Sequence, residues 1–231
     1  MDCKEALKES EGDVDGACEV LRKKGLAKAA KKSGRAATEG LVAGIVSEDG
    51  KKAAMVEVNC ETDFVARTDQ FQAFLKELSK HVLESSPADI EALKTSQLGG
   101  KSVQEKLTDL VARLGENMAL GRFAVLSLEG PGQVGHYVHA GSKIGVLAAV
   151  EAENDEISAN PVFQQVVKDV CLQVCASVPE CLTREEVPAD LLDTERRVLK
   201  EQAVSTGKPE KIVDKIVEGR LKKYYKQIVL L

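Results

Sequence analysis

The sequence is poor in aromatic residues and contains no tryptophan. Phe and Tyr make up 3% of its 231 residues, so the core must consist mainly of Val, Leu, Ile and Ala. With 43% hydrophobic and 30% charged residues, the composition is typical of a folded chain and not of a disordered one. A net charge of −5 disfavours a protein that mainly grips a phosphate backbone. We therefore expect no direct nucleic-acid partner.

Long hydrophobic runs are also missing. No apolar stretch approaches the roughly 18 to 20 residues that cross a bilayer, and no charged-then-apolar leader opens the chain. We therefore expect no membrane partner. The chain starts in a helix-like segment, "MDCKEALKES", and stops on "QIVLL", so we expect the natural protein to be longer.

The patterns that carry covalent or metal chemistry are missing as well. The six cysteines include no C-x-x-C pair, which favours free thiols over a metal site or a redox centre. His136 and His139 lie three apart on an expected strand and so face opposite sides. No G-x-S-x-G, H-E-x-x-H or glycine-rich nucleotide motif occurs. We expect no enzyme, no cofactor and no metal, but a binding or regulatory protein.

The middle of the chain contains an internal repeat with an offset of 92 residues. An amphipathic-helix stripe in the first copy recurs as apolar residues in the second. The paired positions are Phe71, Phe74, Leu75, Leu78 and Val82, and then Phe163, Val166, Val167, Val170 and Val174. Strands are expected at about 40–47 and 52–59, joined through Asp49-Gly50, and at about 133–139 and 144–152. Each copy is thus a small antiparallel sheet with a helix on it, which predicts an α+β fold.

Helical segments flank the two copies. Residues 1–25 are expected to form two short helices closed by Gly25, and residues 26–39 a basic linker. The first subdomain then covers 40–132, with a helix-rich insertion at 87–120, and the second covers 133–187. Residues 188–231 predict two helices joined by a short turn, and hence an antiparallel hairpin.

The segment "NCETDFVART" presents a lone aromatic residue, Phe64, among polar residues. Its repeat partner, 92 residues on, is Glu156. If the fold needed an aromatic side chain there to seal its core, the second copy should also be apolar. The comparison predicts that Phe64 is held outward for a partner, although a packed, structural role stays open.

Three segments, "VNCETDFVAR", "LGENMALGR" and "GKPEKIVDKIVEGRLKK", together resemble the translation elongation factor Ts family. These proteins are guanine-nucleotide exchange factors for elongation factor Tu. Cys3-Lys4 and "GDVDGACEVLRKKG" resemble the family's UBA-like domain, here without its first helix, and the hairpin resembles its coiled coil. The family's C-terminal module, which would follow "QIVLL", is also missing.

The resemblance implies a mechanism without covalent chemistry. The chain would bind GDP-bound and nucleotide-free elongation factor Tu, and would release GDP by disturbing the Mg²⁺ and phosphate site. Contacts with the nucleotide domain are implied for Thr62, Asp63, Phe64, Val65, Leu114, Gly115 and Lys4. A contact with a more distal domain is implied for His139.

Other interpretations stay open. The chain could be a binding-only chaperone or scaffold for elongation factor Tu without efficient exchange. A ubiquitin-type binder leaves most of the chain unexplained, and a cysteine enzyme at Cys60 lacks a visible base. Either a 2:2 assembly with the GTPase or a single pair fits. For the compartment, an organelle (mitochondrial matrix or plastid stroma) is slightly favoured over the bacterial cytoplasm.

Overall fold

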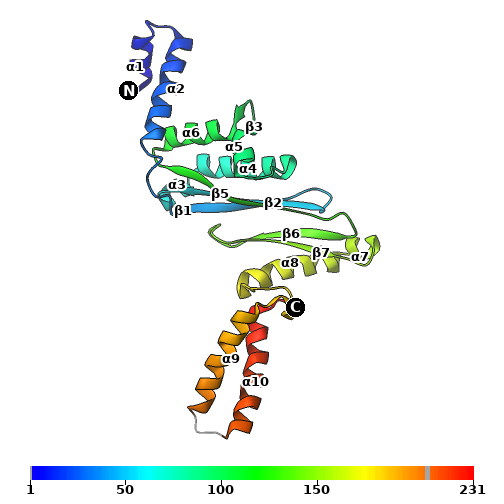
Figure 1. Cartoon of the computed structure of the whole chain (residues 1–231). Helices are drawn as coiled ribbons and strands as arrows, with labels where there is room; N and C mark the ends of the chain where they lie inside the picture. The colour runs from blue at the N-terminus through cyan, green and yellow to red at the C-terminus, as the bar shows by residue number, and fades with distance from the viewer. Residues whose placement is uncertain (1, 206–208) are drawn as a thin grey trace. The chain divides into compact units, whose positions relative to one another are not determined.

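The protein is described by a computed structural model that covers residues 2–205 and 209–231. Figure 1 shows a chain of helices and antiparallel strands, which confirms the predicted α+β fold. The chain divides into two compact units, Met1–Cys171 and Leu172–Leu231. Among the described residues, no helix is both long enough and apolar enough to span a bilayer.

The first unit begins with helices α1 (Asp2–Glu9) and α2 (Val14–Ala30). Asp13 caps α2, because its side chain accepts hydrogen bonds from the backbone of Asp15 and Gly16. The helix does not end at Gly25, as the sequence suggested, but continues to Ala30, so the expected linker starts as helix. The cause is tertiary packing: a Cβ on Gly25 would lie 3.3 Å from Ala112 on α6 (Val103–Leu114).

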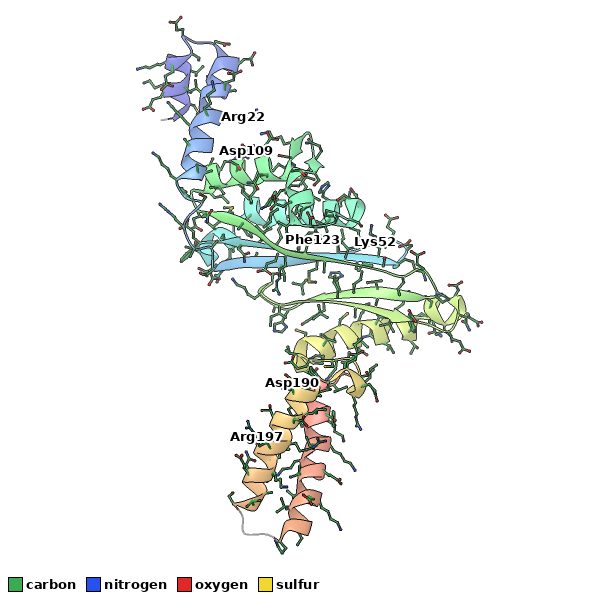
Figure 2. The ribbon with its side chains drawn as sticks, viewed as in Figure 1. Arg22, Lys52, Asp109, Phe123, Asp190 and Arg197 are labelled. Atoms are coloured by element: carbon green, nitrogen blue, oxygen red, sulfur yellow. The ribbon has the colours of Figure 1, made fainter. Side chains whose placement is uncertain are left out.

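A salt bridge supports the same packing of α2 on α6. Arg22, labelled in Figure 2, lies 2.5 Å from the carboxylate of Glu105 at the start of α6. Glu105 also completes a capping box with Ser102, in which each side chain bonds the other residue's backbone. These hydrogen bonds hold the pKa of Glu105 below its usual value.

The first repeat copy contains a three-stranded antiparallel sheet in the order β1-β2-β5. Its strands are β1 (Glu39–Val46), β2 (Lys52–Cys60) and β5 (Met118–Ser127). The turn between β1 and β2 is closed by Asp49, whose carboxylate accepts a hydrogen bond from the Lys51 amide, and by Gly50 at φ 68°. Helices α3 (Asp63–Ala66) and α4 (Asp69–Ser85) follow β2, and α4 packs on the sheet.

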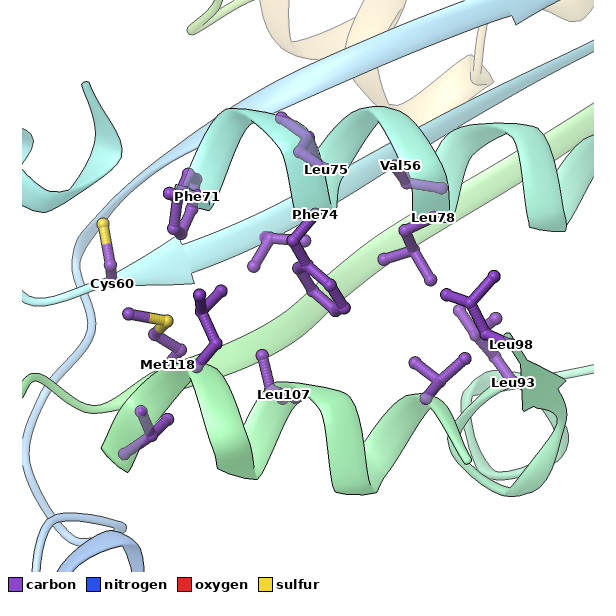
Figure 3. Packing of buried hydrophobic residues seen from close by; sticks show 14 of the residues in the cluster. Val56, Cys60, Phe71, Phe74, Leu75, Leu78, Leu93, Leu98, Leu107 and Met118 are labelled. Atoms are coloured by element: carbon purple, nitrogen blue, oxygen red, sulfur yellow. The ribbon is translucent and has the colours of Figure 1, made fainter. Parts of the chain in front are cut away.

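The segment between α4 and β5 contains a short β-hairpin as well as helices. It holds α5 (Ile90–Thr95), a small hairpin of β3 (Gln97–Leu98) and β4 (Lys101–Ser102), and then α6. The expected insertion at 87–120 therefore also includes the first residues of β5. Figure 3 shows α4, α6 and the sheet closing over one apolar core. Its members include Val56, Cys60, Phe71, Phe74, Leu75, Leu78, Leu93, Leu98, Leu107 and Met118.

The second copy reproduces the first at the predicted offset of 92 residues. It contains β6 (Gly132–Val138), β7 (Gly145–Glu151), α7 (Asp155–Ala159) and α8 (Pro161–Ser177). Helices α7 and α8 begin 92 residues after α3 and α4. Gly40 and Gly132, which are 92 residues apart, have similar φ values of +146° and +138°. A Cβ on either residue would lie 2.3 Å from a carbonyl oxygen of the facing strand. The repeat is therefore a repeat of backbone geometry as well as of residue class.

The two sheets pack against each other through side chains that sit over glycines. A Cβ on Gly44 of β1 would lie 2.7 Å from the His136 ring of β6, and one on Gly145 of β7 would lie 2.3 Å from the sulfur of Met55 on β2. The other face of β6 meets α8, where Val167 lies over Gly135. These close approaches require residues without a side chain.

The second unit holds a 3₁₀ turn (Arg184–Glu186) and the helices α9 (Ala189–Val204) and α10 (Glu210–Ile228). The two helices pack side by side around a small apolar cluster, which confirms the predicted hairpin. The connecting residues 206–208 lie outside the described part of the chain. The segment after α10 pairs beside the segment before α9: the amides of Leu230 and Leu231 donate to the carbonyls of Cys181 and Leu182.

Candidate protein-binding site

The Phe64 side chain lies on a one-turn helix directly after the central strand of the first sheet. We call residues 62–66 the Phe64 turn. Thr62 caps α3, with its backbone extended and its hydroxyl accepting from the Val65 amide. The two residues after Phe64 point into the core, with Val65 9% and Ala66 1% exposed. Phe64 points away from them and is 79% exposed, so the fold does not use its ring.

This degree of exposure is unusual for a phenylalanine in an otherwise well-packed subdomain. Phe71 and Phe74 on the next helix are almost completely buried. Because the protein's own fold does not cover it, the Phe64 ring is available to contact another molecule. The structure thus shows the Phe64 ring pointing outward, and its contact with a partner stays a prediction.

A second loop holds the Phe64 turn from the side. Both oxygens of the Glu116 carboxylate bond Thr62: one accepts from its amide at 3.0 Å and the other from its hydroxyl at 2.7 Å. In return, Glu61 accepts a hydrogen bond from the Asn117 amide at 2.6 Å. The Leu114–Asn117 segment is therefore tied directly to the Phe64 turn.

This second loop contains the predicted residues Leu114 and Gly115. Leu114 is the last residue of α6 and is partly buried. Gly115 caps the helix at φ 81°, a left-handed conformation that favours glycine. The Lys32 ammonium donates to the Gly115 carbonyl, and the Asn117 side chain donates to the carbonyl of Arg35 at 2.6 Å. The segment after α2 thus also contacts this loop.

Asp63 lies within the Phe64 turn, and Cys60 lies just before it. Asp63 forms an i,i+4 salt bridge with Arg67 at 2.8 Å, and because Arg67 is exposed and Asp63 is partly exposed, the pair contributes little stability. Cys60 is buried and donates to the Thr62 carbonyl at 3.1 Å. Burial, with the nearby Glu116 charge, raises the pKa of the Cys60 thiol, which makes it a poor nucleophile.

Two predicted residues lie apart from this cluster. Lys4 is exposed on α1, which packs on α2. His139 is exposed just after β6, and its Nδ1 lies 3.0 Å from the Tyr137 hydroxyl. In the described part of the chain, neither residue has a hydrogen bond or ion pair to the Phe64 turn. The structure therefore brings Thr62–Val65 together with Leu114 and Gly115, but not with Lys4 or His139.

Sequence reasoning missed Glu61 and Glu116. The signal available was a carboxylate directly after β2, Glu61, and another two residues before β5, Glu116. That pattern becomes informative only once the pairing of β2 with β5 is known. Within residues 2–205 and 209–231, no group of three or more His, Cys, Asp or Glu residues is arranged to hold a metal ion.

Comparisons with known proteins identify the family of this chain. The family described as "Elongation factor TS" matches residues 61–231. Proteins named "Elongation factor Ts" from Trichlorobacter lovleyi, Clostridium botulinum and Clostridium perfringens are similar along the whole chain. They are 46%, 47% and 48% identical over 234, 232 and 232 residues, which is 100% of this chain and 75% of each relative.

These matches define the class of protein as a translation factor. Within that class, the chain belongs to the elongation factor Ts family and is a translation elongation factor. These relatives come from bacteria, so they do not support the slight preference for an organelle.

Proposed function

We propose that this chain binds elongation factor Tu and accelerates the release of its GDP, with Phe64 as the side chain that disturbs the nucleotide site. The observation that carries the proposal is the 79% exposure of this ring on a turn whose other apolar residues are buried. On this proposal the chain is an exchange factor that binds no nucleotide itself and makes or breaks no covalent bond. It binds both the GDP-bound and the nucleotide-free form of its partner.

The physical basis is thermodynamic linkage. If the exchange factor and GDP weaken each other's binding to the GTPase, the two effects are equal by reciprocity. Burying one Phe ring contributes about 1.5 to 3 kcal/mol, equivalent to about ten- to a hundredfold in affinity. This energy supplies only a part of the displacement of GDP, and the remainder must come from a broad interface along both repeat halves. The chain then stabilises the open GTPase.

The other predicted residues have supporting roles in this proposal. Asp63 would approach the nucleotide domain beside Phe64, with Thr62 and Val65 holding the turn. The Leu114–Gly115 loop, joined to this turn through Glu116, would touch the same domain. Lys4 on α1 would reach that domain from the UBA-like helices, and His139 would contact a more distal domain. We further infer a cytoplasm of bacterial type and leave a 2:2 assembly open to mass measurement.

The test is the release of fluorescent GDP from elongation factor Tu with and without this chain. We expect fast release with the intact chain and release slowed by about tenfold or more with Phe64→Ala. Val162→Ala is the matched control, because Val162 is also an exposed apolar residue at 71% and lies in the second copy. Binding without faster release would instead support the scaffold interpretation. Equal rates for Phe64→Ala and the intact chain would refute the assigned role of Phe64.

A further inference from the structure

The pairing of β2 with β5 ends where Cys60 faces Met118. If the register continued, Glu61 would face Asn117 and Thr62 would face Glu116. The backbone ladder stops there, yet the facing residues remain joined. The Glu61 carboxylate accepts from the Asn117 amide at 2.6 Å, and the Glu116 carboxylate accepts from the Thr62 amide at 3.0 Å. Each side chain thus supplies the acceptor that a backbone carbonyl would supply in a strand.

These bonds let the chain leave the sheet without losing its alignment. A helix of a single turn has too few internal hydrogen bonds to be stable alone, so outside contacts must orient it. On the inner side of α3, its own buried residues Val65 and Ala66 provide one anchor. At its start, the hydroxyl and amide of Thr62 are both held by Glu116, which is half-buried and uses both carboxylate oxygens. The direction of Phe64 follows from these two anchors.

We propose that Glu116 is a positioning residue for Phe64: by holding both donors of Thr62, it sets the direction in which the ring is presented to the partner. The role in exchange rests on the function proposed above, whereas the holding of Thr62 does not. Glu61 acts from the opposite side by fixing Asn117 next to Glu116. Its other oxygen lies 3.6 Å from the Arg35 guanidinium. The segment after α2 therefore contributes to the same arrangement.

The first measurement is amide hydrogen exchange at Thr62 in the free protein. We expect Glu116→Gln and Glu116→Ala to exchange this amide about tenfold faster or more, since a hydrogen bond to a charged acceptor is lost. Amides in the paired part of β2 should be unchanged. The matched control is Glu57→Ala. Glu57 lies on β2, the strand before the Phe64 turn, and its carboxylate also accepts two hydrogen bonds, from Asn59 and Arg122, neither of which belongs to the turn. An unchanged Thr62 amide in both Glu116 variants would overturn the proposal.

The second measurement is the GDP-release rate as a function of factor concentration. We expect Glu116→Gln to lower the maximal rate by about five- to tenfold and to change the half-saturating concentration by less than about threefold. A residue that only supports folding would instead reduce the active fraction and leave the maximal rate per folded molecule unchanged. That outcome would refute a positioning role.

A double-mutant cycle separates this proposal from the exchange function itself. If Glu116 acts through Phe64, then Glu116→Gln should slow release in the intact chain but not in the Phe64→Ala background. Equal effects in both backgrounds would overturn the proposal and leave the exchange function standing. If Phe64→Ala alone does not slow release, the exchange role fails, and the Thr62 amide still decides whether Glu116 holds the turn. If Glu116→Ala does not fold, Glu116→Gln and Thr62→Val are compared with the intact chain in the same measurements.

Discussion

Two phenylalanines seven residues apart should respond in opposite ways to the same substitution. Phe64 is 79% exposed and Phe71 is 0% exposed. Full burial of a Phe side chain stabilises a fold by about 1.5 to 3 kcal/mol, so Phe64, with about a fifth of its surface covered, contributes at most about 0.6 kcal/mol. Removing a fully buried Phe ring also leaves a cavity and costs about 3 to 5 kcal/mol.

The assay pairs urea unfolding, followed by circular dichroism, with GDP release from elongation factor Tu. We expect Phe64→Ala to leave the unfolding midpoint almost unchanged while it slows release. We expect Phe71→Ala to lower the midpoint strongly while its remaining folded fraction stays active. If Phe64→Ala destabilised the protein by more than about 1.5 kcal/mol, the ring would be packed on its own chain and not available to a partner.

Three further predictions concern the scaffold. Gly40→Ala and Gly132→Ala should each destabilise the chain by at least about 1 to 3 kcal/mol, because both need a positive φ beside a facing carbonyl; a neutral result at either in urea unfolding would contradict the shared geometry. The His136 ring is exposed on one side and lies over Gly44 on the other, and this partial desolvation lowers its pKa below 6.5, so the unfolded chain takes up a proton first as the pH falls. Stability should therefore drop slightly below about pH 6.5, and His136→Gln, compared by unfolding at two pH values, should lose that small part of the drop. Gly219→Ala should stabilise α10 by up to about 1 kcal/mol in thermal unfolding, because an added Cβ would meet nothing within 4 Å; a lower melting temperature would contradict this.

The repeat was predictable because its signals are local. The apolar stripe of α4, the Asp49-Gly50 turn and their counterparts 92 residues later can all be read from short windows of sequence. The exposure of Phe64 was predictable for a related reason: the second copy shows which positions the fold itself requires to be apolar.

The features that were missed depend on contacts between distant segments. Gly25 looks like a helix end, yet α2 passes through it because the lack of a side chain allows close packing on Ala112. Similarly, Glu116 and Thr62 are 54 residues apart and meet only because β5 pairs with β2. A short window of sequence does not indicate that β5 pairs with β2.

The hydrogen-bonded segments around Cys181 and Leu230 give the helical hairpin a closed base. The chain enters and leaves α9 and α10 through neighbouring backbone positions. Equal numbers of helical turns could therefore be removed from both arms, or added to them, while the joined ends keep their spacing. The length of the hairpin is in this way separable from the spacing of its two ends, and evolution or engineering can adjust one without rebuilding the other.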